Sequence, residues 1–135
     1  MLFQIDMAGG SPDEVFPHFW REHDAEVEVK AFAEGLVHGV IKERAALDGI
    51  IAGSAEHWRV ERMAVVDRNI LRVAVYELAW LPHTPPVVVL DEAIEVGKKF
   101  GSEQSGAFIN GILDAVRKRI ERGEVPAARS DRERP

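Results

Sequence analysis

The chain contains no cysteine, which excludes disulfide bonds, thiolate metal sites and catalysis by a thiol. This absence is compatible with the reducing environment of the cytoplasm, where we expect the protein to act. Long apolar runs are also lacking, because none reaches the roughly 20 residues that a membrane-spanning helix needs. We therefore expect no association with a membrane.

A surplus of basic residues is lacking as well. The chain of 135 residues has 17 Lys and Arg against 23 Asp and Glu, giving a net charge of −6. This balance argues against a uniformly basic nucleic-acid binder. It leaves open a protein with a local basic face, or one that holds RNA together with a partner protein.

Motifs for catalysis and metal binding are missing too. The five histidines show no ligand spacing such as HExxH. No serine elbow or phosphate-binding glycine loop is present. Asp91 and Glu92 are neighbours on a predicted helix and point in different directions, so they do not form a catalytic dyad. We expect no enzyme activity, no cofactor and no metal.

The most prominent feature that is present is the stretch from Glu61 to Leu81, ERMAVVDRNILRVAVYELAWL. Its apolar residues recur every three or four positions, which predicts a helix. Because the opposite side is also largely apolar, we expect other helices to cover this central helix on most of its surface.

Further helices are predicted on both sides of it. A start signal at Ser11-Pro12 opens one helix, which Pro17 should kink or shorten. The next begins near Asp24, and the one after the central helix begins at Thr84-Pro85-Pro86. Ser102 should cap the last helix, which Gly123 ends. In the helix that begins near Asp24, the residues expected to face the core are Val29, Phe32, Leu36 and Val40. In the helix that begins at Thr84-Pro85-Pro86, they are Val87, Leu90, Ala93, Ile94 and Phe100.

No segment alternates with period two over a useful length. The prediction is therefore an all-α protein with a single compact domain of about six or seven helices over residues 1–122. Residues 123–135 are predicted to form a flexible charged tail, because they are polar and poor in large apolar side chains.

Three blocks of the sequence resemble the NusB family of bacterial transcription antitermination factors. They are VVDRNILRVAVYEL (65–78), DEAIEVGKKFG (91–101) and FINGILD (108–114), in this order and at this spacing. The resemblance implies an all-helical fold of two packed subdomains. It also implies binding to boxA RNA of ribosomal RNA operons as a heterodimer with NusE, a ribosomal protein. The complex would then join elongating RNA polymerase with other Nus factors and suppress termination.

Members of that family usually begin with an arginine-rich stretch that runs into the first helix. This chain begins with MLFQID, which resembles the middle of that helix. We therefore expect the N-terminal arm to be missing here, and with it some of the contacts to phosphates.

Candidate RNA-binding residues surround one turn between helices, namely Lys98, Lys99, Phe100, Gln104, Ser105 and Phe108. Cations, aromatic rings and amide groups suit single-stranded RNA, which is held by phosphate pairing and base stacking. The family resemblance implies that this turn belongs to the RNA face. The residues alone favour a solvated lysine pair beside two core phenylalanines, since such pairs are common at helix ends.

Candidate partner-binding residues are Phe3, Asp67 and Arg72. The resemblance implies that Asp67 contacts NusE and that Phe3 lies near a second contact. Asp67 and Arg72 can also be buried charges that satisfy each other or the neighbouring backbone. Asn110 is a poor helix former, so we expect a structural hydrogen bond from its side chain, and we expect Gly106 and Gly111 to permit tight helix crossing.

Two other classes of function stay open. NusB-like domains also target some ribosomal RNA cytosine methyltransferases to RNA, so the chain could be the targeting module of such an enzyme. Alternatively, the chain could be a self-associating helical protein, a homodimer whose RNA surface is blocked.

Overall fold

The structure is a computed structural model, and it describes residues 11–23, 25–55, 59–81 and 83–125. These residues form six α-helices and one short 3-10 helix, with no strand among them, so the prediction of an all-α fold is confirmed. Within the same residues, no helix is both long enough and apolar enough to cross a bilayer. The chain divides into two compact units, Met1–Glu43 and Arg44–Pro135.

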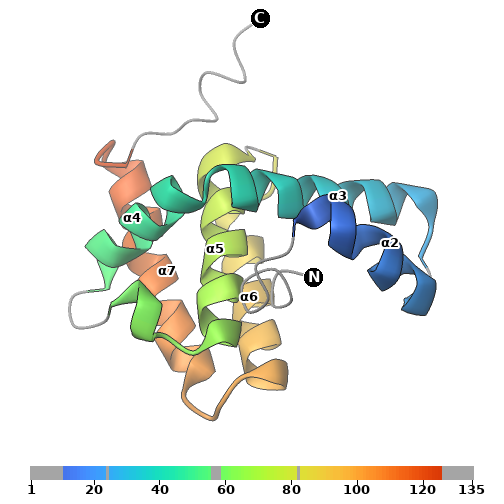
Figure 1. Cartoon of the computed structure of the whole chain (residues 1–135). Helices are drawn as coiled ribbons and strands as arrows, with labels where there is room; N and C mark the ends of the chain where they lie inside the picture. The colour runs from blue at the N-terminus through green and yellow to red at the C-terminus, as the bar shows by residue number, and fades with distance from the viewer. Residues whose placement is uncertain (1–10, 24, 56–58, 82, 126–135) are drawn as a thin grey trace, which may run out of the picture. The chain divides into compact units, whose positions relative to one another are not determined.

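The first unit contains α2 (Pro12–Glu22) and α3 (Val27–Lys42), which form a helical hairpin (Figure 1). Among the described residues of this unit, Phe16 and Val37 are buried together, and Val40 is also buried. Pro17 lies inside α2 without ending it, so the predicted shortening did not occur.

The predicted core stripe of α3 is wrong at two positions. Val29 and Phe32 are exposed, with 60% of the surface of Phe32 accessible. The helical period identified an apolar face of α3 correctly, but a period cannot tell whether another element covers that face.

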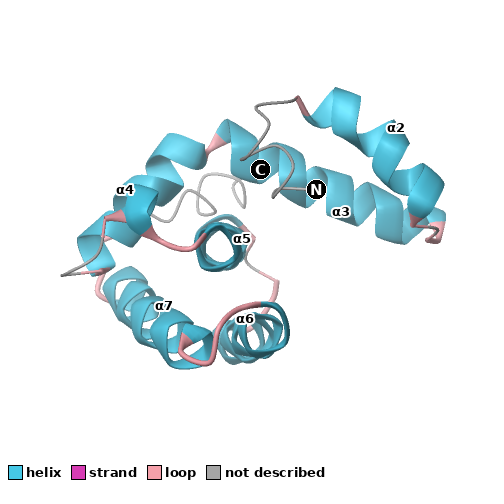
Figure 2. Cartoon of the chain, turned by 60° about the horizontal axis from the view of Figure 1, so that its bottom comes forward, coloured by secondary structure: helices cyan, strands magenta, loops and turns pink. Residues whose placement is uncertain are grey.

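The second unit is built around α5 (Val65–Trp80), the predicted central helix. The helices α4 (Arg44–Ser54), α6 (Pro86–Phe100) and α7 (Ser105–Glu121) pack against it, as the end-on view in Figure 2 shows. Most of α5 is buried, which explains why its sequence is apolar nearly all round. The helix starts four residues later than Glu61, because Val60–Arg62 form the 3-10 helix η1.

The last two helices form a hairpin whose inner faces are apolar. Pro86 opens α6, where its missing N–H costs no hydrogen bond. Val87 points outward with 67% of its surface exposed, so its predicted place in the core is wrong. The residues of α7 that are buried include Ile109, Ile112, Leu113 and Val116.

The chain continues to pack against the core beyond Gly123, where the flexible tail is predicted to start. Gly123 adopts a φ of 73°, a left-handed conformation that suits glycine and ends the helix. The backbone N–H of Glu124 then donates to the carbonyl of Arg119 at 2.9 Å. This turn directs Val125 into the core, where it is buried, so the chain still packs two residues beyond Gly123. The rest of the predicted tail, residues 126–135, lies outside the described residues.

Candidate nucleic-acid interface

The turn between α6 and α7, at the bottom of Figure 1, brings cationic and aromatic side chains together on the surface. Lys98, Lys99 and Phe100 are exposed in the last turn of α6, and 63% of the surface of Phe100 is accessible. The Nζ atom of Lys99 lies 5.3 Å from the centre of the Phe100 ring. The Nζ atom of Lys98 lies 3.9 Å from a carboxylate oxygen of Glu95, an exposed pair that contributes little stability. An exposed phenylalanine beside two lysines differs from the predicted core position of Phe100.

Ser105 has a different place from the other candidates, because only 1% of its surface is exposed. Its hydroxyl oxygen accepts the backbone N–H of Ser102 at 2.8 Å. A Cβ atom on Gly101 would overlap the same hydroxyl, so the turn requires glycine at that position. Ser105 therefore shapes the turn from inside. The prediction that the Ser102 side chain caps the last helix is therefore wrong. The hydrogen bond runs the other way, from the Ser102 backbone N–H to the Ser105 side chain.

Gln104 and Phe108 complete the set. Gln104 is exposed immediately before α7, and its side-chain oxygen lies 3.4 Å from the Ser102 hydroxyl. Phe108 is half-buried one turn later. We call the residues Lys98, Lys99, Phe100, Gln104 and Phe108 the turn surface. The sequence-predicted RNA residues thus lie together, with Ser105 beneath them.

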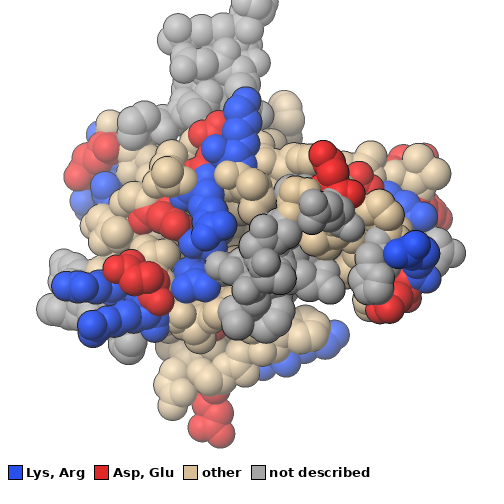
Figure 3. Space-filling model, in the orientation of Figure 1, with Lys and Arg blue, Asp and Glu red and all other residues tan. Residues whose placement is uncertain are grey.

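Charges of both signs are mixed over the surface of the protein. Figure 3 shows Lys and Arg side chains in a short column and in smaller groups, with Asp and Glu side chains beside them. On α7, Asp114 binds Arg117 at 2.8 Å and Lys118 at 3.0 Å. Hydrogen bonds from Arg117 and Lys118 lower the pKa of Asp114, so this carboxylate stays ionised and paired.

The candidate partner-binding residues are more deeply placed. Arg72 is 4% exposed, and its Nε and Nη2 atoms donate to the two carboxylate oxygens of Asp48 at 2.8 and 2.9 Å. This bidentate pair joins α5 to α4. Asp67 is 8% exposed in the first turn of α5, and no described residue donates a hydrogen bond to its Oδ1 atom. Phe3 lies outside the described residues.

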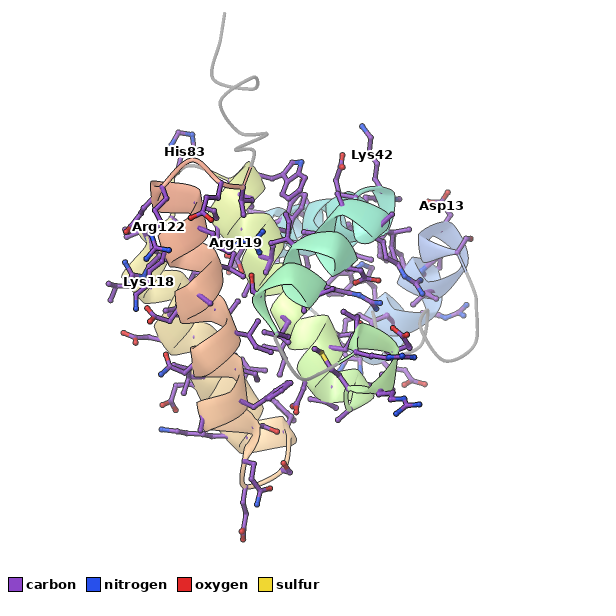
Figure 4. The ribbon with its side chains drawn as sticks, turned by 90° about the vertical axis from the view of Figure 1, so that its left-hand side faces the viewer. Asp13, Lys42, His83, Lys118, Arg119 and Arg122 are labelled. Atoms are coloured by element: carbon purple, nitrogen blue, oxygen red, sulfur yellow. The ribbon has the colours of Figure 1, made fainter. Side chains whose placement is uncertain are left out.

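Arg119, which sequence reasoning did not single out, and Asn69 of the central helix also matter structurally. Arg119 of α7 lies between α7 and α4, whereas Lys118 and Arg122 point away from α4 (Figure 4). The Nη1 atom of Arg119 donates to the carbonyl of Ile50 at 3.2 Å and to the Ser54 hydroxyl at 2.6 Å. Asn69 accepts a hydrogen bond from Arg72 at 3.3 Å. Nothing in the sequence pattern separates Arg119 from the exposed cations next to it.

The described residues contain no group of three or more His, Asp or Glu side chains that could hold a metal ion. The side chains of the turn surface offer hydrogen bonding, charge pairing and stacking.

Comparison with known proteins gives a consistent result. A family model described as the NusB family matches residues 1–118. The transcription antitermination protein NusB of Anaeromyxobacter dehalogenans is 48% identical over 132 residues, covering 97% of this chain and 89% of the relative. The structure of T. maritima NusB superimposes with a TM-score of 0.79 at 32% identity, covering 98% of this chain and 89% of that one. A complex of NusB and NusE with double-stranded RNA contains a chain with a TM-score of 0.79 at 30% identity, with 87% of each chain covered. This protein therefore belongs to the NusB family.

Proposed function

We propose that this protein is a transcription antitermination factor that binds boxA RNA of ribosomal RNA operons together with ribosomal protein NusE. It acts as an adaptor in the cytoplasm, joining the RNA to elongating RNA polymerase in company with other Nus factors. The observation that carries the proposal is Phe100, a large aromatic side chain left 63% exposed between lysines in a chain of this family.

The turn surface suits single-stranded RNA in two ways. The exposed face of Phe100 offers a platform on which an unpaired base can stack. Lys98 and Lys99 lie beside it and can pair with phosphates on either side of the stacked nucleotide. Because the chain as a whole carries a net charge of −6, these few cations give weak binding alone. Docking of NusE would complete a composite RNA site.

Asp67 is the proposed contact for NusE. A buried carboxylate oxygen without a hydrogen bond costs about 1–3 kcal/mol. An N–H group of NusE that donates to Oδ1 would remove this cost, because no described residue donates a hydrogen bond to that atom. Because this oxygen is buried, docking requires the Asp67 side chain to turn outward. Asp67→Ala should therefore weaken NusE binding without lowering the stability of the free protein.

The test is a titration of labelled boxA RNA with the protein alone and with NusE. NusE should raise the affinity, and Phe100→Ala should lower it about tenfold in the presence of NusE, since stacking on an aromatic side chain contributes about 1–3 kcal/mol per base. Val87→Ala is the matched control, because Val87 is 67% exposed at the other end of α6. No gain from NusE, or equal effects of the two substitutions, would contradict the proposal.

The lysines provide a separate measurement. Changing both Lys98 and Lys99 to alanine should flatten the plot of log affinity against log salt concentration by about one to two units of slope. The curated relative reported above carries the name of an antitermination protein. That name favours the adaptor over the targeting module of a methyltransferase.

A further inference from the structure

The FINGILD block contains two residues that the packing of the fold does not explain. Gly111 lies in the interior of α7 and is exposed, and a Cβ atom added there would meet no other atom within 4 Å. Asn110 beside it is also exposed, and its side chain forms no hydrogen bond with the described part of the chain. Asparagine and glycine both weaken a helix. The predictions of a structural hydrogen bond at Asn110 and of tight helix crossing at Gly111 are therefore wrong.

Other glycines of the hairpin show what a packing role looks like. A Cβ atom on Gly97 would lie 2.6 Å from Cδ1 of Ile109, and one on Gly106 would lie 3.2 Å from Cγ of Lys98. These two glycines allow α6 and α7 to approach closely. Gly111 has no such neighbour. Whatever favours glycine at this position therefore lies on the solvent side of α7.

The position of Gly111 connects it to the turn surface. Residues that are four and seven apart share one face of a helix, so Gly111 follows Gln104 and Ala107 on the exposed face of α7. Lys118 continues the same face seven residues later and points into solvent (Figure 4). These residues form a strip about 20 Å long on which the side chains of Ala107 and Gly111 are small or absent. The strip starts at the turn surface and ends at Lys118.

The charges along the strip are compatible with a polyanion. Asp114 is the one acidic side chain of α7 within four residues of Gly111, and it is bound by both Arg117 and Lys118. Asn110 offers an amide donor and a carbonyl acceptor, which match the edges of RNA bases and the ribose 2′-hydroxyl. An absent side chain at Gly111 lets a ribose approach the helix backbone.

We propose that this strip, formed by Gln104, Ala107, Asn110, Gly111 and Lys118, extends the RNA-binding surface along α7. The nucleotide next to the one stacked on Phe100 lies flat against Gly111, and the Asn110 amide hydrogen-bonds to it. The inference rests on the proposed RNA-binding function of the turn surface. It assigns to Asn110 and Gly111 a role in binding that outweighs their cost to the helix.

The test compares Gly111→Ala with Gly49→Ala. Gly49 is also exposed in the interior of a helix of the same unit, with nothing within 4 Å of an added Cβ atom. Both substitutions should raise the midpoint of thermal unfolding by about 3–5 °C, because alanine is the better helix former. Only Gly111→Ala should weaken binding of boxA RNA in the presence of NusE, by about tenfold, because the new methyl group overfills a close contact. Asn110→Ala should weaken binding about fivefold.

Binding of NusE without RNA is measured for each variant as well. If the wild-type protein with NusE does not bind boxA RNA, the proposed function itself fails. If the wild type binds but Gly111→Ala binds equally well, or Gly49→Ala loses as much affinity, the strip is refuted while the turn surface stands. A loss confined to NusE binding would assign the strip to the protein partner and would also overturn the inference.

Discussion

At the scale of single residues, the buried polar groups of α5 decide how the second unit is held together. Arg72 is enclosed, and its guanidinium group binds the carboxylate of Asp48 with the two-point geometry that arginine favours. Its Nη1 atom also donates to Asn69. Asp48 and Asn69 both belong to this unit, which gives Arg72 a structural role in the free protein.

Replacing Arg72 by methionine should lower the free energy of unfolding by about 3 kcal/mol, because the Asp48 carboxylate loses its partner. Urea denaturation followed by circular dichroism measures this change. Arg117→Met is the control, since Arg117 pairs with Asp114 and Glu121 on the surface and should cost less than about 1 kcal/mol. Equal losses in the two variants would refute a structural role for the Arg72 pair.

Glu77 provides a prediction about pH. Burial raises the pKa of Glu77 above its ordinary value, and the charge on Glu92 raises it further. The folded state therefore binds this proton more tightly than the unfolded chain, so ionisation costs stability as the pH rises from the ordinary pKa through the folded pKa. Glu77→Gln should raise the unfolding temperature at pH 7. This gain in unfolding temperature should vanish below about pH 4.3, where Glu77 is protonated in both the folded and the unfolded state.

The control for Glu77 is Glu61→Gln, which changes an exposed glutamate of η1. Between pH 3 and pH 8, the difference in unfolding temperature from the wild type should grow with pH for Glu77→Gln but not for Glu61→Gln. A gain that persists unchanged at low pH would mean that charge is not the cause.

At the scale of helices, the hairpin of α6 and α7 depends on small residues at defined positions. Gly97 is buried, and Ile109 opposite it has no exposed surface. Because Ile109 is enclosed, its side chain has little room to move aside for an added methyl group.

Gly97→Ala should consequently lower the free energy of unfolding by about 1–3 kcal/mol. Gly35→Ala in α3 is the matched control, because nothing lies within 4 Å of an added Cβ atom there. The control should be neutral or gain up to about 1 kcal/mol, since alanine favours a helix. Thermal unfolding of both variants provides the comparison, and stabilisation by Gly97→Ala would contradict the close approach of α6 and α7.

The same helices show what could be predicted from sequence. The identity of α5 and α7 and the stop before Pro82 followed from periodicity and turn residues, because these are local properties of the chain. The exposure of Phe32, Val87 and Phe100 did not follow. Whether an apolar residue at the edge of a helix face is covered depends on a neighbour that the pattern does not name.

The candidate site divides in a similar way. The clustering of Lys98, Lys99 and Gln104 was predictable, since all lie within one short turn. The burial of Ser105 was not, because it depends on a hydrogen bond that reverses the expected direction of capping. The family resemblance supplied the proposed role of Asp67, and no local pattern indicated that its Oδ1 atom would be enclosed.

At the scale of the whole molecule, the described parts of the two units differ in how many residues they bury. Among the described residues of the first unit, the buried ones are Phe16, Val37 and Val40. In the second unit, α5 alone buries ten residues. Local opening should therefore require less free energy in the first unit.

Amide hydrogen exchange followed by mass spectrometry should show this difference. Peptides from α2 and α3 should exchange at lower protection than peptides from α5 and α7. Addition of boxA RNA with NusE should raise protection around the turn surface. Equal protection of both units in the free protein would show that they open together as one cooperative body.

The contact made by Arg119 has a consequence for synthesis of the protein. Ile50 precedes Arg119 by 69 positions, so the ribosome completes α4 well before it adds the arginine that binds the end of that helix. Until then, the Ser54 hydroxyl can still donate to the Ile50 carbonyl, but neither group has the arginine as a partner. We therefore expect α4 to fray more at this end in a chain whose translation stops before Arg119. Arg119 of α7 thus completes the hydrogen bonds at the carboxyl end of α4, a helix that lies far earlier in the chain.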